Sequence, residues 1–125
     1  METLVDLYTS IRARYPALAA RADEEHLRRW GEISPALAPA WFENLAASVN
    51  ASMQSGTPEA SHVSLFKDLA NAFRSGRPDV RTCIDVSFVE NLFWEVPTDK
   101  VPQYWCSLPP ILQDLYVSFH KRAPL

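Results

Sequence analysis

The feature that most constrains the fold is the stretch from Asp79 to Val96, DVRTCIDVSFVENLFWEV, which holds the densest run of large apolar side chains and no helix breaker. On a helix of 3.6 residues per turn, one stripe contains Val80, Ile84, Phe88 and Leu92. A second stripe beside it contains four more apolar residues: Val86, Val89, Phe93 and Val96. Because apolar groups then surround the axis, we expect a central helix over about residues 79–96 that neighbouring helices cover.

The first part of this stretch also allows a different interpretation. From Val80 to Phe88 apolar and β-branched residues alternate with more polar ones, which is the period of a half-buried β-strand. A strand needs a partner strand, however, and no other segment of the chain offers a convincing one. The helical interpretation is therefore favoured.

The remaining sequence predicts further helices that end at prolines. Ten prolines against three glycines favour helices over sheets joined by tight turns. We expect helices from Leu4 to Tyr15, from an N-cap at Asp23, from Trp41 to Met53, from an N-cap at Thr57 with Pro58 in the first turn, and after Pro109 and Pro110, with a short helical turn between Thr98 and Leu108.

Together these segments predict one all-α domain over residues 1–125, a single compact bundle of five to seven helices. Glu24 with Arg28 and Glu25 with Arg29 are predicted to form i,i+4 pairs on a solvated helix face. The predicted core includes Ile84, Phe88, Leu92, Phe66, Leu69, Phe73, Leu45, Leu112 and Leu115.

Charge and composition exclude several classes of partner. Twelve basic and fifteen acidic residues give a formal charge of -3, so the chain lacks the excess of basic residues that binding to a nucleic-acid backbone requires. The N-terminus lacks a basic segment followed by an apolar core, and no stretch approaches the roughly 20 apolar residues of a membrane span. We therefore expect a cytoplasmic protein that binds neither nucleic acid nor membrane. Cys83 and Cys106 lack CxxC spacing and lie among apolar residues, so both are predicted to be reduced and buried.

No catalytic motif is present. His26, His62 and His120 lie in three separate segments without metal-ligand spacing, and the chain contains neither a glycine-rich phosphate loop nor a GxSxG elbow. We expect no metal, no cofactor and no enzymatic activity, with a small helical enzyme as the less favoured alternative.

A run of four carboxylates without a basic residue separates Arg81 from Lys100, and it suggests a binding surface. These carboxylates either give a mostly buried helix its solvated edges, or form an acidic and aromatic patch that anchors an interface. On the second interpretation the predicted partner-binding residues are Glu95, Asp99, Tyr104, Trp105, Trp94 and Glu90, besides Asp85. Glu90 and Asn91 suit a buried structural role equally, and Trp94 and Trp105 suit the core equally.

The sequence LFKDLANAFRSGRPDVRTCIDVSFVENLFW, with its SGRPDV connector and VSFVENL core, resembles a family of small bacterial domains found as immunity proteins beside polymorphic toxins. The similarity covers about residues 61–96, with a weaker match in LPPILQDLYVSF. The resemblance implies a cytoplasmic protein that neutralises one cognate toxin, expected to have a basic surface, by a stoichiometric complex that occludes its active site or substrate path. A generic helical interaction or regulatory domain is the alternative, because the motif consists of packing residues.

Overall fold

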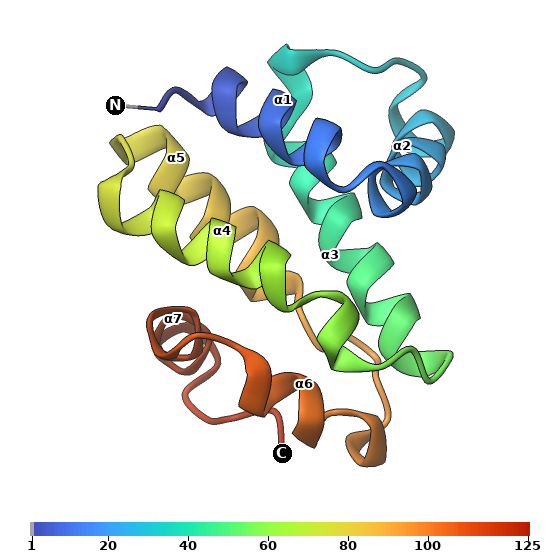
Figure 1. Ribbon diagram of the computed structural model, residues 1–125, viewed down its shortest axis with the longest axis vertical. Coiled ribbons are helices and arrows are strands. Elements are labelled where there is room, and N and C mark those ends of the chain that lie inside the picture. The colour runs from blue at the N-terminus through green and yellow to red at the C-terminus, as the bar shows by residue number, and fades with distance from the viewer. Residues whose placement is uncertain (1) are drawn as a thin grey trace.

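A computed structural model describes residues 2–125, and this part of the chain contains seven α-helices and no strand (Figure 1). The prediction of an all-α fold with five to seven helices is confirmed. The helices are α1 (Leu4–Arg14), α2 (Pro16–Trp30), α3 (Ala38–Gln54), α4 (Val63–Ser75), α5 (Pro78–Thr82), α6 (Pro102–Ser107) and α7 (Pro110–His120).

The first two helices meet at a bend that Pro16 imposes, because proline ends α1 and occupies the first position of α2. The prediction that the second helix begins at an Asp23 N-cap is therefore wrong. Asp23 lies in the middle of α2, where its carboxylate accepts a hydrogen bond from the Trp41 indole at 2.7 Å and pairs with Arg12 at 2.6 Å. The carboxylate thus ties α1 and α2 to α3.

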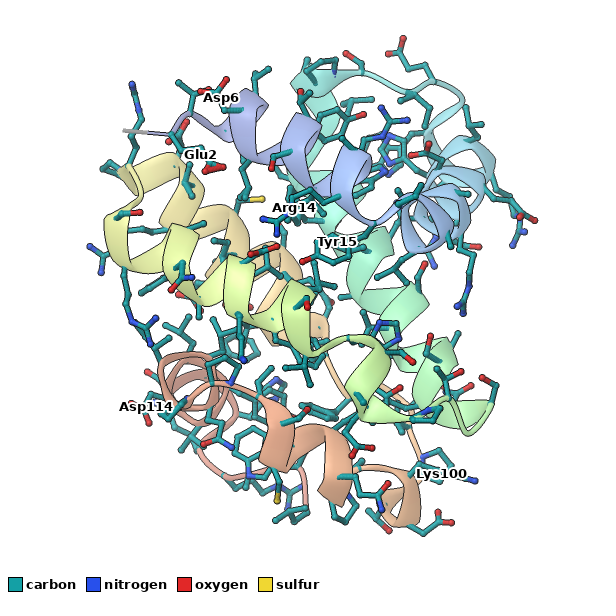
Figure 2. The ribbon with its side chains drawn as sticks, viewed as in Figure 1. Glu2, Asp6, Arg14, Tyr15, Lys100 and Asp114 are labelled. Atoms are coloured by element: carbon teal, nitrogen blue, oxygen red, sulfur yellow. The ribbon has the colours of Figure 1, made fainter. Side chains whose placement is uncertain are left out.

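Asp68 of α4 makes a second connection to the N-terminal helices. Arg14 and Tyr15 point from the end of α1 toward α4 (Figure 2), where the Arg14 guanidinium lies 2.9 Å from the Asp68 carboxylate and the Tyr15 hydroxyl donates to it. Burial and the contact with Asp68 raise the pKa of Tyr15 to about 12. The hydroxyl therefore stays a hydrogen-bond donor at any physiological pH.

Helix α3 is the longest helix and is buried on most of its surface. Trp41, Phe42 and Leu45 on α3 are completely buried in the core. The side of α3 that faces α2 carries small polar residues, and Arg21 of α2 donates to the Ser52 hydroxyl at 3.1 Å. Helix α3 also packs against the segment Cys83–Phe88, so α3 and this segment share the centre of the bundle.

The segment expected to form one helix over 79–96 is helical only to Asn91. Helix α5 continues into a π-helical turn at Cys83–Phe88 and a 3₁₀ turn at Val89–Asn91, and the chain becomes extended at Leu92. At this end of the helix, the side-chain amide of Asn91 donates a hydrogen bond to the Ser87 carbonyl at 2.8 Å. A π turn holds more residues than an α turn, which changes the phase of the stripes. Val86 is consequently 46% exposed, against the prediction.

The connection before α4 differs from the prediction, and the connection after α4 explains a glycine in the sequence. A 3₁₀ turn at Glu59–Ser61 precedes α4, so the predicted helix start at Thr57 is wrong and α4 begins at Val63. After α4, a Cβ on Gly76 would lie 2.8 Å from Val80 Cγ1 and even closer to a backbone oxygen of α4. The SGRPDV connector therefore needs glycine so that α4 and α5 can approach each other.

One continuous core extends from α1 to α7. Every predicted core residue is buried except Leu115, which is partly buried. Cys83 is buried as predicted, but Cys106 is exposed, so that half of the cysteine prediction is wrong. Among residues 2–125, no helix has both the length and the apolar character needed to cross a membrane.

Candidate functional site

Trp94 is the most unusual side chain on the surface. Its side chain is 70% exposed, whereas the neighbouring Phe93 is buried. The two residues that flank it, Phe93 and Glu95, have φ angles of 66° and 56°, in the left-handed region that non-glycine residues avoid. Strain of this kind persists only where the surrounding structure enforces it, and it concentrates at functional sites.

Two amide side chains of α3 enforce this conformation. Asn50 is buried, and its Oδ1 accepts the Phe93 backbone N–H at 2.8 Å while its Nδ2 donates to the Asn91 carbonyl at 2.9 Å. One turn further along α3, Gln54 donates to the Glu95 carbonyl at 3.2 Å. Residues 91–96, here called the Trp94 loop, are therefore fixed to α3 on both sides of the exposed tryptophan.

An aromatic cluster supports the Trp94 loop from within the molecule. The Phe93 ring packs edge to face on Trp105 and Tyr116, with ring centroids 5.9 and 5.5 Å away. Tyr116 in turn stacks on His120, whose Nε2 lies 3.1 Å from the Glu90 carbonyl oxygen. Trp105 is half-buried in this cluster, so its position is beneath the loop rather than beside Trp94.

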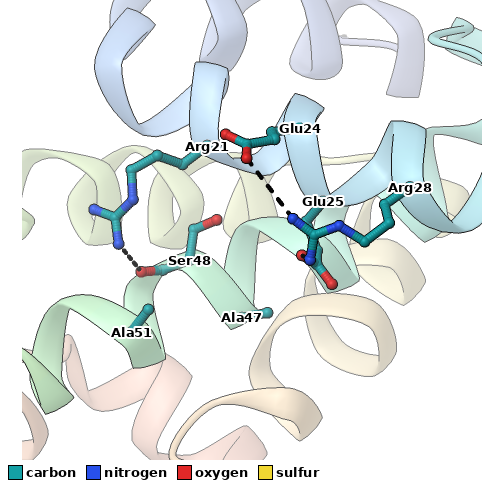
Figure 3. Close-up of a pocket in the computed structure, with 7 residues that line it drawn as sticks. All are labelled: Arg21, Glu24, Glu25, Arg28, Ala47, Ser48 and Ala51. Atoms are coloured by element: carbon teal, nitrogen blue, oxygen red, sulfur yellow. Dashed lines mark hydrogen bonds and ion pairs between the residues drawn. The ribbon is translucent and has the colours of Figure 1, made fainter.

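A surface groove runs along α3 between α2 and the Trp94 loop. It consists of three neighbouring hollows that all have Ala47 in their lining, and Ala51 contributes to two of them. Figure 3 shows the hollow that α2 borders, with Ala47 and Ala51 on α3 and the charged side chains of α2 opposite. Trp94 lines the other two hollows. We call this feature the α3 groove.

Helix α2 forms one wall of the α3 groove, and most of the charged side chains in this wall are paired with one another. Glu25 pairs with Arg28 at 2.9 Å, and Glu24 lies 3.7 Å from Arg28 (Figure 3). Glu25 also pairs with Arg29 at 3.1 Å. These contacts confirm the predicted i,i+4 pairs.

The opposite side of the groove is different. Glu43 lines the same hollow as Trp94, and Glu95 lines the next one. Within residues 2–125 neither carboxylate forms a salt bridge. The uncompensated charge beside Trp94 is therefore negative.

Asp99 and Tyr104 lie elsewhere, in a hollow of about 450 Å³ between the α3–α4 connection and α6. Asp99 is exposed, as expected, but Tyr104 is only 4% exposed. Its hydroxyl donates to the Thr57 carbonyl at 2.6 Å, and burial raises its pKa. Tyr104 therefore offers almost no surface to a partner, because this hydrogen bond and the core hold the ring in place.

Glu90 and Asp85 are half-buried and belong to the helical part of the central segment. Burial raises the pKa of both carboxyl groups, and for Glu90 the Asp85 charge adds to the effect. The six predicted partner-binding residues are thus not one patch, and the structure brings only Trp94 and Glu95 together in the α3 groove.

Sequence reasoning missed three residues that shape the site: Glu43, Asn50 and Gln54 of α3. Their spacing on a helix reveals that they share a face, but nothing local indicates that a loop more than forty residues away lies across it.

Two of the three histidines, His26 and His62, are buried. His26 is completely buried, with Nδ1 3.1 Å from the Asn44 side-chain nitrogen, and His62 is buried near Tyr104. In the part of the chain that the structure describes, no three His, Cys, Asp or Glu side chains are close enough to hold a metal ion.

The structure is all-α, with a surface groove along α3 beside the exposed Trp94. The chain belongs to the family described as a domain of unknown function, DUF7674, whose model matches residues 8–122. This match includes α2 and α3, which form most of the α3 groove. No curated protein and no solved structure matches the chain.

Proposed function

We propose that this protein is an immunity protein that binds one cognate bacterial toxin in the cytoplasm and neutralises it by forming a stoichiometric complex. The complex occludes the toxin's active site or the path of its substrate. The immunity role rests on the sequence resemblance over about residues 61–96, and the protein-binding role rests on the surface of the molecule.

The observation that carries the binding role is Trp94 on its fixed loop. Tryptophan is among the residues that most often supply the binding energy of an interface, roughly 2 kcal/mol or more at a hot spot. Asn50 and Gln54 hold the loop in one conformation before any partner arrives. A preformed contact loses less conformational entropy on binding, which favours tight association.

Two alternatives use the same molecule differently. A generic interaction or regulatory domain would use the same tryptophan with a partner that is not a toxin. A small-molecule binder or enzyme would use the hollow beside Asp99 and Tyr104, whose volume of about 450 Å³ falls within the usual range for ligand pockets, roughly 300–1,000 Å³.

The direct test is co-expression with a toxin-domain protein encoded beside this gene. We expect a one-to-one complex by size-exclusion chromatography with light scattering, and protection of cells that express the toxin domain. Trp94→Ala should weaken the complex by about 30-fold or more. Absence of a complex together with absence of protection would contradict the immunity role, and a complex without protection would favour the generic interaction domain.

A charge-reversal variant tests whether carboxylates face the toxin. Glu95→Lys combined with Asp99→Lys should slow association and weaken its dependence on salt, because opposite charges steer the encounter. Thermal melting of the variant checks that the fold is intact. Unchanged affinity would place the interface elsewhere, with the Asp23 to Arg29 region of α2 as the next candidate.

A further inference from the structure

We propose that the hollow between Glu43 and Trp94 is a socket for a basic side chain, a lysine or an arginine, of the partner protein. This inference rests on the proposed function only in taking the partner to be a protein. It names a different and smaller site than the whole interface, and it identifies the chemistry of the group that enters it.

The first argument is the arrangement of donors and acceptors in the socket. Asn50 and Asn91 both line it, and the side-chain NH₂ group of each donates to a backbone carbonyl, at 2.9 and 2.8 Å. Arg29 also lines it, and its Nε donates to Glu25 at 3.1 Å. The Glu43 carboxylate, in contrast, has no salt-bridge partner in residues 2–125. An ionised carboxylate only accepts hydrogen bonds, so a ligand group that supplies donors can pair with Glu43.

The second argument is the tryptophan itself. The negative face of an indole ring attracts a cation, and tryptophan is the strongest of the aromatic residues in this respect. Trp94 is 70% exposed, so its ring is free to stack on an incoming ammonium or guanidinium group. Glu95 lines the adjoining hollow and adds a second carboxylate next to the ring. A basic side chain on Trp94 therefore gains both a cation–π contact and a charge-assisted hydrogen bond.

Arg29 is the one cation that lines the socket, and its position is compatible with this assignment. Its guanidinium pairs with Glu25, a half-buried carboxylate of the same helix. This pair compensates the charge of Arg29, whereas Glu43 and Glu95 have no salt-bridge partner within residues 2–125. The attraction for a second cation is therefore concentrated at the tryptophan.

The test uses a phage-displayed library of random 16-residue peptides, selected on the intact protein and depleted on the Trp94→Ala variant. We expect enriched peptides to share a lysine or arginine at one fixed position. Synthetic peptides are then titrated against the wild-type protein and two variants. Trp94→Leu keeps an apolar side chain but removes the aromatic ring, and should weaken binding by about 2- to 30-fold. Glu43→Gln with Glu95→Gln removes the charge at constant shape and should also weaken binding.

Two controls make the result specific. Asp114→Asn removes an exposed carboxylate on α7, outside the three hollows of the α3 groove, and should leave peptide affinity unchanged. Replacing the fixed basic residue of the peptide by methionine should abolish the difference between wild type and Trp94→Leu, since the two changes remove the same contact.

Three results would each overturn the socket: no enriched peptide, enriched peptides without a fixed basic residue, or equal affinities for wild type and both variants. These results are independent of the immunity role, because the selection uses no toxin. A toxin complex that forms normally but is insensitive to Trp94→Leu and to the two glutamine substitutions would reject the socket and keep the proposed function.

Discussion

Individual residues illustrate what a pattern of apolar spacing can and cannot decide. Cys83 lies on a segment whose apolar groups surround the axis, and it is buried as that pattern predicts. Cys106 also follows large apolar residues, but α6 has only six residues, and it directs Tyr104 inward and Cys106 outward. A helix of this length has too few turns to reveal its buried face from sequence.

The two thiols should therefore react very differently with Ellman's reagent. Burial raises the pKa of Cys83 to about 12, so almost no reactive thiolate forms there near neutral pH. We expect one rapidly titrated thiol in the native protein and two after denaturation. The Cys106→Ser variant should show none until it is unfolded. Rapid reaction of two thiols in the native wild type would show that Cys83 is accessible.

His62 should make stability depend on pH. Burial, together with the positive charge of Arg21, lowers the pKa of His62 below its ordinary value of 6.5. The unfolded chain then binds a proton more readily than the native protein, so the contribution of His62 to stability is complete above about pH 6.5 and is lost as the pH falls through the lowered native pKa. Urea denaturation between pH 7.5 and 5 should show this loss, and His62→Phe should reduce it. An identical pH dependence in both proteins would contradict the assignment.

At the scale of elements, periodicity identified which segments are helical but not how the most apolar one is divided. The 79–96 segment is helical as far as Asn91, and Val80, Ile84 and Phe88 of its first stripe are buried, but Val86 of the second stripe is exposed. The π turn, the extended Leu92 and the two left-handed residues that follow depend on contacts with α3 that are remote in sequence, above all with Asn50. The predicted start of the second helix was wrong for a related reason. The helix begins at Pro16, which is a stronger start signal than an acidic N-cap at Asp23.

The importance of Asn50 for the Trp94 loop can be measured directly. Asn50→Ala removes both hydrogen bonds and leaves the buried Phe93 N–H without a partner, which should lower the free energy of unfolding by about 2–3 kcal/mol. Hydrogen exchange at the Phe93 amide should accelerate more than exchange in α1, because the loop opens locally. Asn71→Ala is the matched control: its side chain is exposed on α4 and should change stability by less than about 0.5 kcal/mol. Equal effects of the two substitutions would show that the loop is held by other contacts.

At the scale of the whole molecule, the candidate site combines parts of the chain that sequence analysis treated separately. The acidic and aromatic run near Trp94 can be recognised from the sequence alone, because the order of the residues shows tryptophans next to carboxylates that have no basic neighbour. The other half of the groove comes from α2 and α3, and its location depends on how the bundle closes. Tyr104 and Asp99, close in sequence to Glu95, line a different hollow from it.

The bundle should also unfold as one unit, and Phe88 is the residue that tests this. Its ring is completely buried in the π-helical turn that packs against α3, at the junction between the N-terminal and C-terminal helices. Phe88→Ala should cost about 3–5 kcal/mol, from lost burial and the cavity left behind. That is a large share of the roughly 5–15 kcal/mol that stabilises a typical domain.

Because the core is continuous from α1 to α7, the loss should lower the melting temperature in a single transition, by about 10–20 °C. Phe119→Ala is the control, since its ring is 55% exposed near the end of α7 and its loss should change the melting temperature by only a few degrees. Hydrogen exchange in α1 and in α7 should accelerate equally in Phe88→Ala if both halves depend on the same core. A second transition, or protection retained in α1 alone, would show instead that α1 to α3 form a unit that is stable without the C-terminal helices.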